Sequence, residues 1–183
     1  MTTSKDDYLW FPMRVTYRRE LKIKQHLDDL GIENFVPMHY EMVETAKGSK
    51  RKLVPAIHNL IFVHSTQATL TELKTGKKEF EPLRYMMRPT ENGDHEIIHV
   101  PDYQMNNFLK VASVKDESVF FLKCNDFINK IGTRVRVTGG YFKDVEGTIK
   151  RVKKNKHVVV QIEGVAAVAI AFVPASYLTI IPS

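Results

Sequence analysis

Cysteine is nearly absent from this sequence: Cys124 is the only one among the 183 residues. A single cysteine excludes an internal disulfide and is typical of a protein that works in the cytoplasm. Because unpaired cysteines behave mostly as small packing residues, we expect Cys124 to pack against its neighbours rather than to act as a nucleophile.

Long apolar runs are also missing. The longest, Val165 to Pro174, is shorter than the roughly 18 residues that a membrane-spanning helix needs. The segment from Met1 to Asp7 is polar and has no apolar stretch of the kind that secretory signals carry. We therefore expect a cytoplasmic protein that does not enter a membrane.

Sequence signatures of catalysis are lacking as well. No glycine-rich phosphate loop with its lysine occurs, and no Ser/His/Asp arrangement is supported. The H-E-x-x-H signature of zinc peptidases does occur, from His95 to His99, but residues 92–94 predict a turn before it and Pro101 follows it. On a strand, at roughly 3.3 Å per residue, the two histidines would stand about 13 Å apart, too far to share one zinc ion. We expect no enzymatic activity, no cofactor and no metal site.

What the sequence does contain is an uneven distribution of charge. The chain has 27 Lys and Arg and 21 Asp and Glu residues, a net charge of +6. Residues 123–183 hold 10 basic and 4 acidic residues, also +6, so residues 1–122 hold 17 of each sign. Excess positive charge in the last third indicates a polyanionic partner such as nucleic acid or the ribosome. The alternative is a solvated basic surface that serves solubility.

Residues 8–112 alternate between strand and helix patterns. Aromatic and β-branched residues predict strands at 10–16, 35–43, 53–64, 85–88 and 96–100. Ile23, Leu27 and Leu30 recur at helical spacing, which predicts a first helix that ends at Gly31. Two more helices are predicted at 67–74 and 101–111, and a polar loop within a hairpin at 45–52. This order is typical of an α+β sandwich.

The rest of the chain changes character. Residues 113–126 begin with polar side chains and predict a linker. Residues 127–183 have an all-β pattern, in which Val135 and Val137 alternate with arginines. Five short strands in about 55 residues predict a small barrel.

One motif in this second part is specific. From Gly132 to Ile149 the chain reads G-x-R-V-R-V-x-x-G-x-F-K-x-x-E-G-x-I, a strand followed by a glycine turn and a second strand that contains Gly147. This layout resembles the KOW motif of SH3-like barrels. The chain departs from the motif at Tyr141, where proline is frequent, and at Asp144, where glycine is common.

The first part narrows the resemblance. Trp10 opens a strand, an amphipathic helix follows, and the strand that begins at Leu53 contains Ile-His-Asn-Leu-Ile-Phe-Val at 57–63. From about Tyr8 to Ile181 this order resembles the NusG family, with an N-terminal NGN domain at 8–112, a linker at 113–126 and a KOW barrel at 127–183. The sequences at 57–63 and at 163–174 are most similar to those of the UpxY-type paralogues, which act as antiterminators of surface polysaccharide operons.

In that family the first domain binds the tip of the RNA polymerase clamp helices through an apolar depression. The resemblance implies polymerase contacts here at Trp10, Arg14, Ile57, Leu60, Phe62 and Met86. An exposed apolar patch with an aromatic anchor is the physical signature of such a site. The alternative is core packing, because alternate residues of a buried strand must be apolar.

The first predicted helix carries basic residues opposite its apolar side. They are Arg18, Arg19, Lys22 and His26. The resemblance places this basic stripe beside the non-template DNA strand, where phosphate contacts would make binding salt-dependent. The alternative is a solvated helix face.

In the barrel, the resemblance implies that the loop near Phe142 and the strand near Ile162 contact a ribosomal protein or a termination factor. Core packing is the alternative for both side chains. The basic residues between Lys150 and His157 are a candidate RNA contact. No feature indicates an oligomer, and we expect a monomer.

Two other functions remain open. One is a KOW-type RNA-binding or ribosome-associated module that never touches polymerase, although the neutral balance of residues 1–122 disfavours an RNA surface there. The other is a fold-switching relative whose C-terminal domain first hides the polymerase site as helices. The β-branched run at 158–162 favours a barrel, whereas the alanine-rich run at 165–171 suits either structure.

Overall fold

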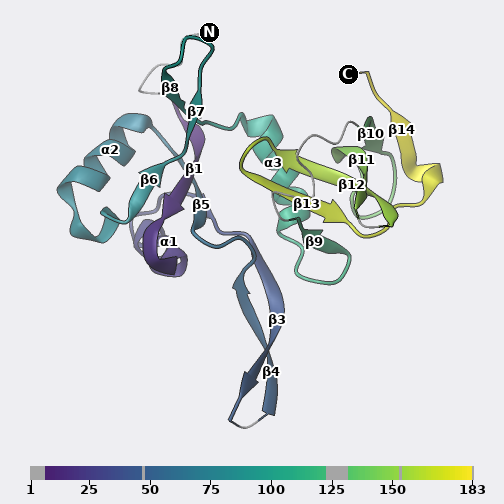
Figure 1. Cartoon of the computed structure of the whole chain (residues 1–183), viewed down its shortest axis with the longest axis horizontal. Helices are drawn as coiled ribbons and strands as arrows, with labels where there is room; N and C mark the ends of the chain where they lie inside the picture. The colour runs from purple at the N-terminus through teal and green to yellow at the C-terminus, as the bar shows by residue number, and fades with distance from the viewer. Residues whose placement is uncertain (1–6, 47, 123–131, 153, 183) are drawn as a thin grey trace. The chain divides into compact units, whose positions relative to one another are not determined.

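The chain folds into two compact units, and each contains two stretches of sequence (Figure 1). The computed structural model describes residues 7–46, 48–122, 132–152 and 154–182, so Cys124 lies outside the described residues. The first unit comprises Met1–Pro37 and Ile57–Asp102, and the second comprises Met38–Ala56 and Tyr103–Ser183. Residues 38–56 and 103–112 group with the second unit, and the domains expected at 8–112 and 127–183 stay a prediction.

A four-stranded antiparallel sheet forms the centre of the first unit, in the order β2-β5-β1-β6. Its strands are β1 (Leu9–Val15), β2 (Asn34–Phe35), β5 (Leu60–Ser65) and β6 (Leu83–Tyr85). The pairing of β1 with β5 runs from Leu9 opposite Ser65 to Arg14 opposite Leu60. Buried side chains occupy both faces of β1, since Trp10, Phe11, Pro12 and Met13 are all buried in succession. The predicted strand at 10–16 is confirmed. The prediction of one continuous strand at 53–64 was wrong, because residues 56–59 form a turn and only residues 60–64 of that range lie in β5.

The first unit also contains two helices and two short 3₁₀ turns. They are α1 (Glu20–Asp29), α2 (Gln67–Gly76), η1 (Thr16–Arg18) and η2 (Lys78–Phe80). Helix α1 buries Ile23 and Leu27, and α2 buries Leu70 and Leu73, as helical spacing of apolar residues requires. Gly31 follows α1 with φ of 67°, and its N–H donates to the Asp28 carbonyl at 2.9 Å. The predicted helix end at Gly31 is therefore confirmed.

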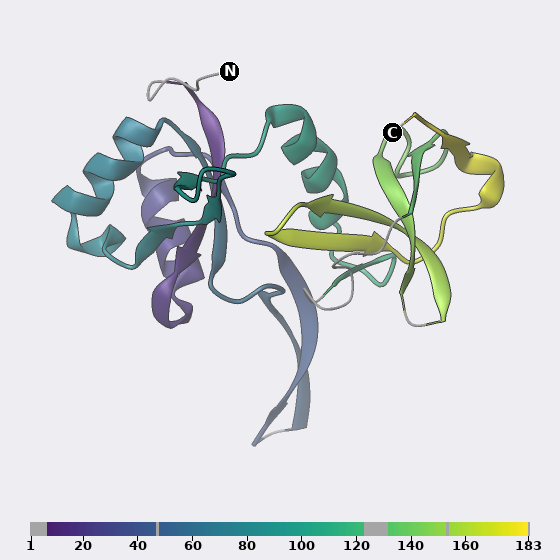
Figure 2. The same ribbon diagram turned by 45° about the horizontal axis from the view of Figure 1, so that its top comes forward.

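Two hairpins form separate two-stranded sheets. In Figures 1 and 2, β3 (Met38–Thr45) and β4 (Gly48–Pro55) form a twisted two-stranded ribbon. The predicted hairpin is confirmed, but its register extends to Thr45 opposite Gly48, so most of the loop predicted at 45–52 is strand. The residues next to this turn are polar and exposed on both strands, and polar composition therefore did not separate strand from loop. The second hairpin pairs β7 (Met87–Pro89) with β8 (His95–Ile97).

A six-stranded antiparallel sheet dominates the second unit, in the order β14-β10-β11-β12-β13-β9. The strands are β9 (Val119–Phe121), β10 (Thr133–Val137), β11 (Glu146–Val152), β12 (Asn155–Ile162), β13 (Ala166–Ile170) and β14 (Leu178–Ile180). The turn η3 (Ala175–Tyr177) precedes β14. The alternation predicted at 133–137 is confirmed, with Val135 and Val137 buried. The alanine-rich run is a strand, and the expected linker at 113–126 contains β9, which pairs with β13.

Two positions of the KOW-like motif show why its glycines matter. A Cβ atom on Gly147 would lie 2.8 Å from both Val158 Cγ1 and the Val159 carbonyl oxygen. The backbone of β12 thus leaves room only for glycine there. Asp144 has φ of 69°, the left-handed region that favours glycine, which explains why glycine is common at this place in the motif. The α+β class, with a β-rich KOW-like second part, is confirmed.

Candidate partner-binding surfaces

Three of the six expected polymerase contacts lie in the core of the structure. Trp10, Leu60 and Phe62 are 3%, 4% and 0% exposed. The Trp10 ring stacks on the His64 ring with centroids 4.9 Å apart, and the ring centroids of Phe62 and Phe35 lie 6.5 Å apart. The burial of these three side chains agrees with the alternative of core packing, because strands β1 and β5 are buried on both faces. Their apolar character is explained by packing.

The other three expected contacts reach the surface. Arg14 is exposed, whereas Ile57 and Met86 are half-buried. Ile57 precedes β5, Met86 follows β6, and β1 lies between those two strands. Arg14 stands opposite Arg84 in the pairing of β1 with β6, and both side chains are exposed. Two like charges side by side on a sheet repel each other, and an acidic partner would relieve that repulsion.

The expected basic stripe is only partly helical. Arg18 lies in η1 and Arg19 precedes the helix, so only Lys22 and His26 lie within α1. Lys22 is exposed. His26 is half-buried and turns its ring towards Phe80, with centroids 6.1 Å apart. The surface cations are therefore Arg18, Arg19 and Lys22, and His26 contributes to packing.

A left-handed corner joins β1 to α1, and sequence reasoning missed it. Tyr17 has φ of 62° and ψ of 31°, and the next residue, Arg18, has φ of 53°. The Tyr17 side chain is 83% exposed. The Arg19 guanidinium lies 5.4 Å from the centroid of its ring. No glycine or asparagine marks this turn, so the sequence carried no signal for it.

The two expected contacts in the barrel are buried. Phe142 is 9% exposed and Ile162 is 2% exposed, which agrees with core packing. Tyr141 is the exposed neighbour, at 77%, and meets Phe142 edge to face with ring centroids 5.2 Å apart. The surface of this loop is therefore formed by Tyr141 rather than by Phe142.

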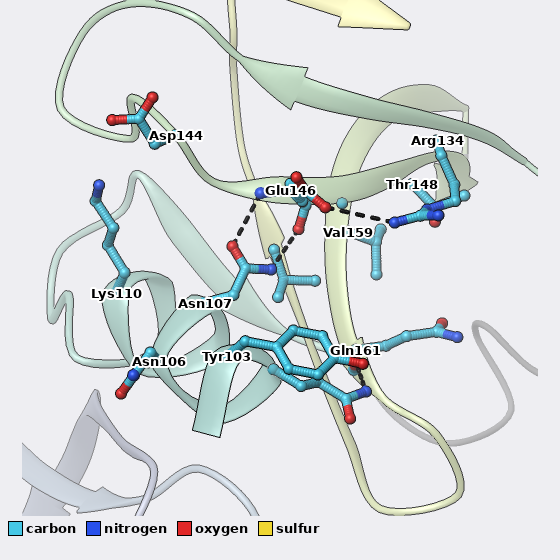
Figure 3. Close-up of a pocket in the computed structure, with 13 residues that line it drawn as sticks. Tyr103, Asn106, Asn107, Lys110, Arg134, Asp144, Glu146, Thr148, Val159 and Gln161 are labelled. Atoms are coloured by element: carbon cyan, nitrogen blue, oxygen red, sulfur yellow. Dashed lines mark hydrogen bonds and ion pairs between the residues drawn. The ribbon is translucent and has the colours of Figure 1, made fainter. Parts of the chain in front are cut away.

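Within the second unit, helix α3 (Asp102–Ala112) and strands β11 and β12 line a pocket of about 520 Å³ (Figure 3). The Asn107 side chain forms two hydrogen bonds with the backbone of Glu146. Its Nδ2 donates to the Glu146 carbonyl at 2.5 Å, and the Glu146 N–H donates to its Oδ1 at 2.9 Å. Gln104 donates to the Gln161 carbonyl at 3.4 Å. These bonds attach α3 to the sheet of the second unit.

Three groups with displaced pKa values lie at contacts between a helix and a neighbouring segment. Burial lowers the pKa of Lys74, whose Nζ lies 4.2 Å from the centroid of the Tyr85 ring. Burial also raises the pKa of Tyr85, which donates to the Gln67 carbonyl at 3.2 Å. Side-chain hydrogen bonds from Lys24 and Asn34 lower the pKa of Asp28. Each arrangement ties a helix to a neighbouring segment, and none resembles a nucleophile beside a base.

The H-E-x-x-H segment has the wrong structure for a zinc peptidase. His95 and Glu96 lie on β8, whereas the zinc signature needs both histidines on one helical turn. Glu96 instead accepts a hydrogen bond from Arg88 Nε at 2.5 Å. Among the described residues, no cluster of three His, Cys, Asp or Glu side chains could hold a metal ion.

None of the helices in the described part of the chain is long and apolar enough to cross a membrane. A comparison with curated proteins gave no significant match. Among solved structures, one of domain interaction in Thermotoga maritima NusG is similar, with 14% identity and a TM-score of 0.45 over 96% of this chain and 98% of that chain. Conformation B of the MjSpt4:Spt5 complex gave 13% identity and a TM-score of 0.29 over 96% and 98%.

Comparison with family models gave a match over more than half of the chain. The model for transcription termination factor nusG aligns with residues 8–109, which include the whole sheet of the first unit and most of α3. The chain therefore belongs to the NusG family, whose members are non-enzymatic transcription factors that bind RNA polymerase.

Proposed function

We propose that this protein is a transcription elongation factor and antiterminator that binds the clamp helices of RNA polymerase through its first unit. The observation that carries the proposal is the family match over residues 8–109. The resemblance of residues 57–63 and 163–174 to the UpxY-type paralogues supports surface polysaccharide operons as targets. Such a factor acts in the cytoplasm.

The polymerase-binding surface that we propose is built on the side chains that reach solvent. Ile57 and Met86 supply apolar area, and the paired cations Arg14 and Arg84 supply charge. Trp10, Leu60 and Phe62 support this surface from below, since they are buried. Substitutions at those three positions would damage the core, so they do not test polymerase binding.

The test is co-elution of the full-length protein with bacterial core RNA polymerase on size exclusion. We expect Arg14→Glu and Met86→Asp to weaken binding by about tenfold or more each, because each places an unpaired charge in the interface. Lys115→Glu is the matched control, since it reverses an exposed charge in the second unit. Unchanged circular dichroism would show that the variants fold. A folded wild-type chain that does not co-elute would rule out this function.

We also propose that Arg18, Arg19 and Lys22 contact phosphates of the non-template DNA strand. All three side chains are exposed; Arg18 and Arg19 lie in the β1–α1 connection and Lys22 lies in the first turn of α1. In the second unit, we propose that the loop around Tyr141 contacts a ribosomal protein, a termination factor or RNA. Phe142 and Ile162 would then act by shaping the loop and the strand from inside.

A second candidate function is an RNA-binding or ribosome-associated module that does not bind polymerase. The observation that favours it is the net charge of +6 carried by residues 123–183. Failure to co-elute with polymerase, together with salt-dependent binding of RNA by the same full-length protein, would support this alternative.

A further inference from the structure

The β1–α1 corner, residues 15–20, is a strained piece of backbone. Tyr17 and Arg18 are consecutive residues with positive φ, and neither is glycine or asparagine. In this region the Cβ atom crowds the neighbouring carbonyl oxygen, which disfavours L-residues. Such strain persists only where the surrounding structure over-determines the conformation, and it is concentrated at functional sites.

Asn59 holds the corner in place. Its Oδ1 accepts the Arg18 N–H at 3.1 Å, and its backbone carbonyl accepts the Val15 N–H at 3.0 Å. The Asn59 N–H in turn donates to the carboxylate of Glu20, a side chain that is only 1% exposed. Asn59 itself has φ of 61°. A buried carboxylate and two left-handed segments thus lock one turn.

This backbone conformation places the aromatic ring of Tyr17 in solvent. Tyr17 is 83% exposed, so its ring gains little from packing. Glycine would adopt the same backbone at lower cost, and stability therefore does not explain a tyrosine there. Burial of the ring against a partner would contribute to the free energy of binding. The backbone fixes the position of the ring before the partner binds, which lowers the entropy cost of binding.

The surroundings of the ring indicate the chemistry of that partner. The Arg19 guanidinium lies 5.4 Å from the ring centroid. Arg18, the residue after Tyr17, and Lys22, in the first turn of α1, are both exposed. An aromatic platform combined with cations fits a ligand that has both a flat ring and negative charge. Single-stranded nucleic acid has this combination, because an unpaired base stacks while the adjoining phosphates meet cations.

We propose that Tyr17 is the stacking platform for one unpaired base of single-stranded DNA, with Arg18, Arg19 and Lys22 on the flanking phosphates. The proposal rests on the DNA contact put forward above and adds the residue that distinguishes an unpaired strand from a duplex. In a duplex the face of each base is covered by its neighbours, so Tyr17 would gain nothing there.

The experiment is an anisotropy titration of the full-length protein with a labelled DNA strand of about 12 nucleotides at about 50 mM salt, beside the same strand as RNA and as a DNA duplex. We expect Tyr17→Ala to weaken binding of the DNA strand by about 5- to 100-fold, the range for loss of one base–aromatic stack. Tyr17→Phe should remain within about twofold of wild type, since the ring is kept. Duplex binding should be the same for all three proteins.

Two further variants and one control separate stacking from folding and from charge. Tyr17→Gly should lose binding as Tyr17→Ala does while it keeps the thermal stability of wild type, because glycine suits this backbone. Tyr103→Ala is the matched control, a tyrosine that is 78% exposed in α3, and it should bind as wild type. Arg19→Gln should weaken binding of strand and duplex alike and reduce its dependence on salt.

The possible outcomes distinguish the stacking role of Tyr17 from the phosphate contact and from polymerase binding. If Tyr17→Ala binds the DNA strand like wild type, or if it loses strand and duplex equally, Tyr17 is not a stacking platform. If only the Arg19 variant matters, the phosphate contact stands and the stacking role falls. Binding of the RNA strand in preference to the DNA strand would contradict the assignment to DNA. Co-elution of Tyr17→Ala with polymerase should be unchanged, so the polymerase proposal is judged separately.

Discussion

Gly147 shows how a single missing side chain fixes the spacing of two strands. Replacing it with alanine would place a Cβ atom 2.8 Å from the Val159 carbonyl oxygen, and that backbone lies in the middle of β12. We expect Gly147→Ala to lower the free energy of unfolding by about 1–3 kcal/mol, because strands β11 and β12 would have to move apart. Thermal denaturation followed by circular dichroism measures this loss.

Gly76 provides the comparison for that experiment. It is the last residue of α2, and a Cβ atom there would meet nothing within 4 Å. Gly76→Ala should therefore leave the midpoint of thermal unfolding unchanged or raise it slightly. Equal destabilisation by both alanines would show that close approach of β12 is not the cause.

Individual residues also show where sequence reasoning reached its limit. An apolar residue on a strand has the same appearance whether it fills the core or meets a partner, and Trp10 and Phe62 proved to be core. Tyr17 shows the opposite failure, since nothing in its sequence context predicts a left-handed backbone. Its conformation depends on Asn59, a residue distant in the sequence, and such long-range restraints are not visible in a local pattern.

At the scale of elements, helix α3 depends on one side chain for its attachment to β11. Asn107→Ala removes two hydrogen bonds and leaves the Glu146 N–H without its acceptor. We expect a loss of about 1–3 kcal/mol in the free energy of unfolding and faster amide exchange at Glu146. Hydrogen exchange measured by NMR reads that single amide.

The neighbouring residue supplies the control. Asn106 is exposed on the same helix, so Asn106→Ala should leave exchange at Glu146 as it is in wild type. If Glu146 exchanged at the same rate in Asn107→Ala as in wild type, α3 would not be attached in this way.

Elements with a regular burial pattern were predictable, and those without one were not. The alternation of valines and arginines at 133–137 identified β10 to the residue, because one face of that strand is buried. Strands β3 and β4 have few buried side chains, so the polar residues at 45–52 predict a loop where the structure has mostly strand. Strand β9 was missed because its three residues are too few for a periodic signal.

At the scale of the whole molecule, the pairing of β9 predicts where the C-terminal β-rich part of the chain begins. β9 pairs with β13, and Leu122 packs in a cluster with Val152, Val159, Ala167 and Ala169. We expect a fragment of residues 113–183 to be more stable than one of residues 127–183 by about 2–5 kcal/mol, since the shorter one loses a strand and a buried leucine. Urea denaturation of both fragments compares them.

Equal stability of the two fragments would favour the expected linker at 113–126 over a structural role for β9. The family-level organisation was predictable from the order of motifs along the chain, whereas the limits of the units were not. Motifs mark the centres of folded parts, but the limits depend on contacts such as those of α3 and β9, which join residues far apart in the sequence.

The β3–β4 ribbon also bears on the behaviour of the protein at high concentration. Its two strands pair only with each other in the described part of the chain, so both outer edges offer backbone donors and acceptors to another molecule. Open edges of this kind promote aggregation through strand pairing between copies. Lys50, Arg51 and Lys52 follow one another along β4, and their mutual repulsion between copies opposes such pairing. Salt screens that repulsion, so we expect concentrated solutions of the protein to aggregate more slowly at low salt than at high salt.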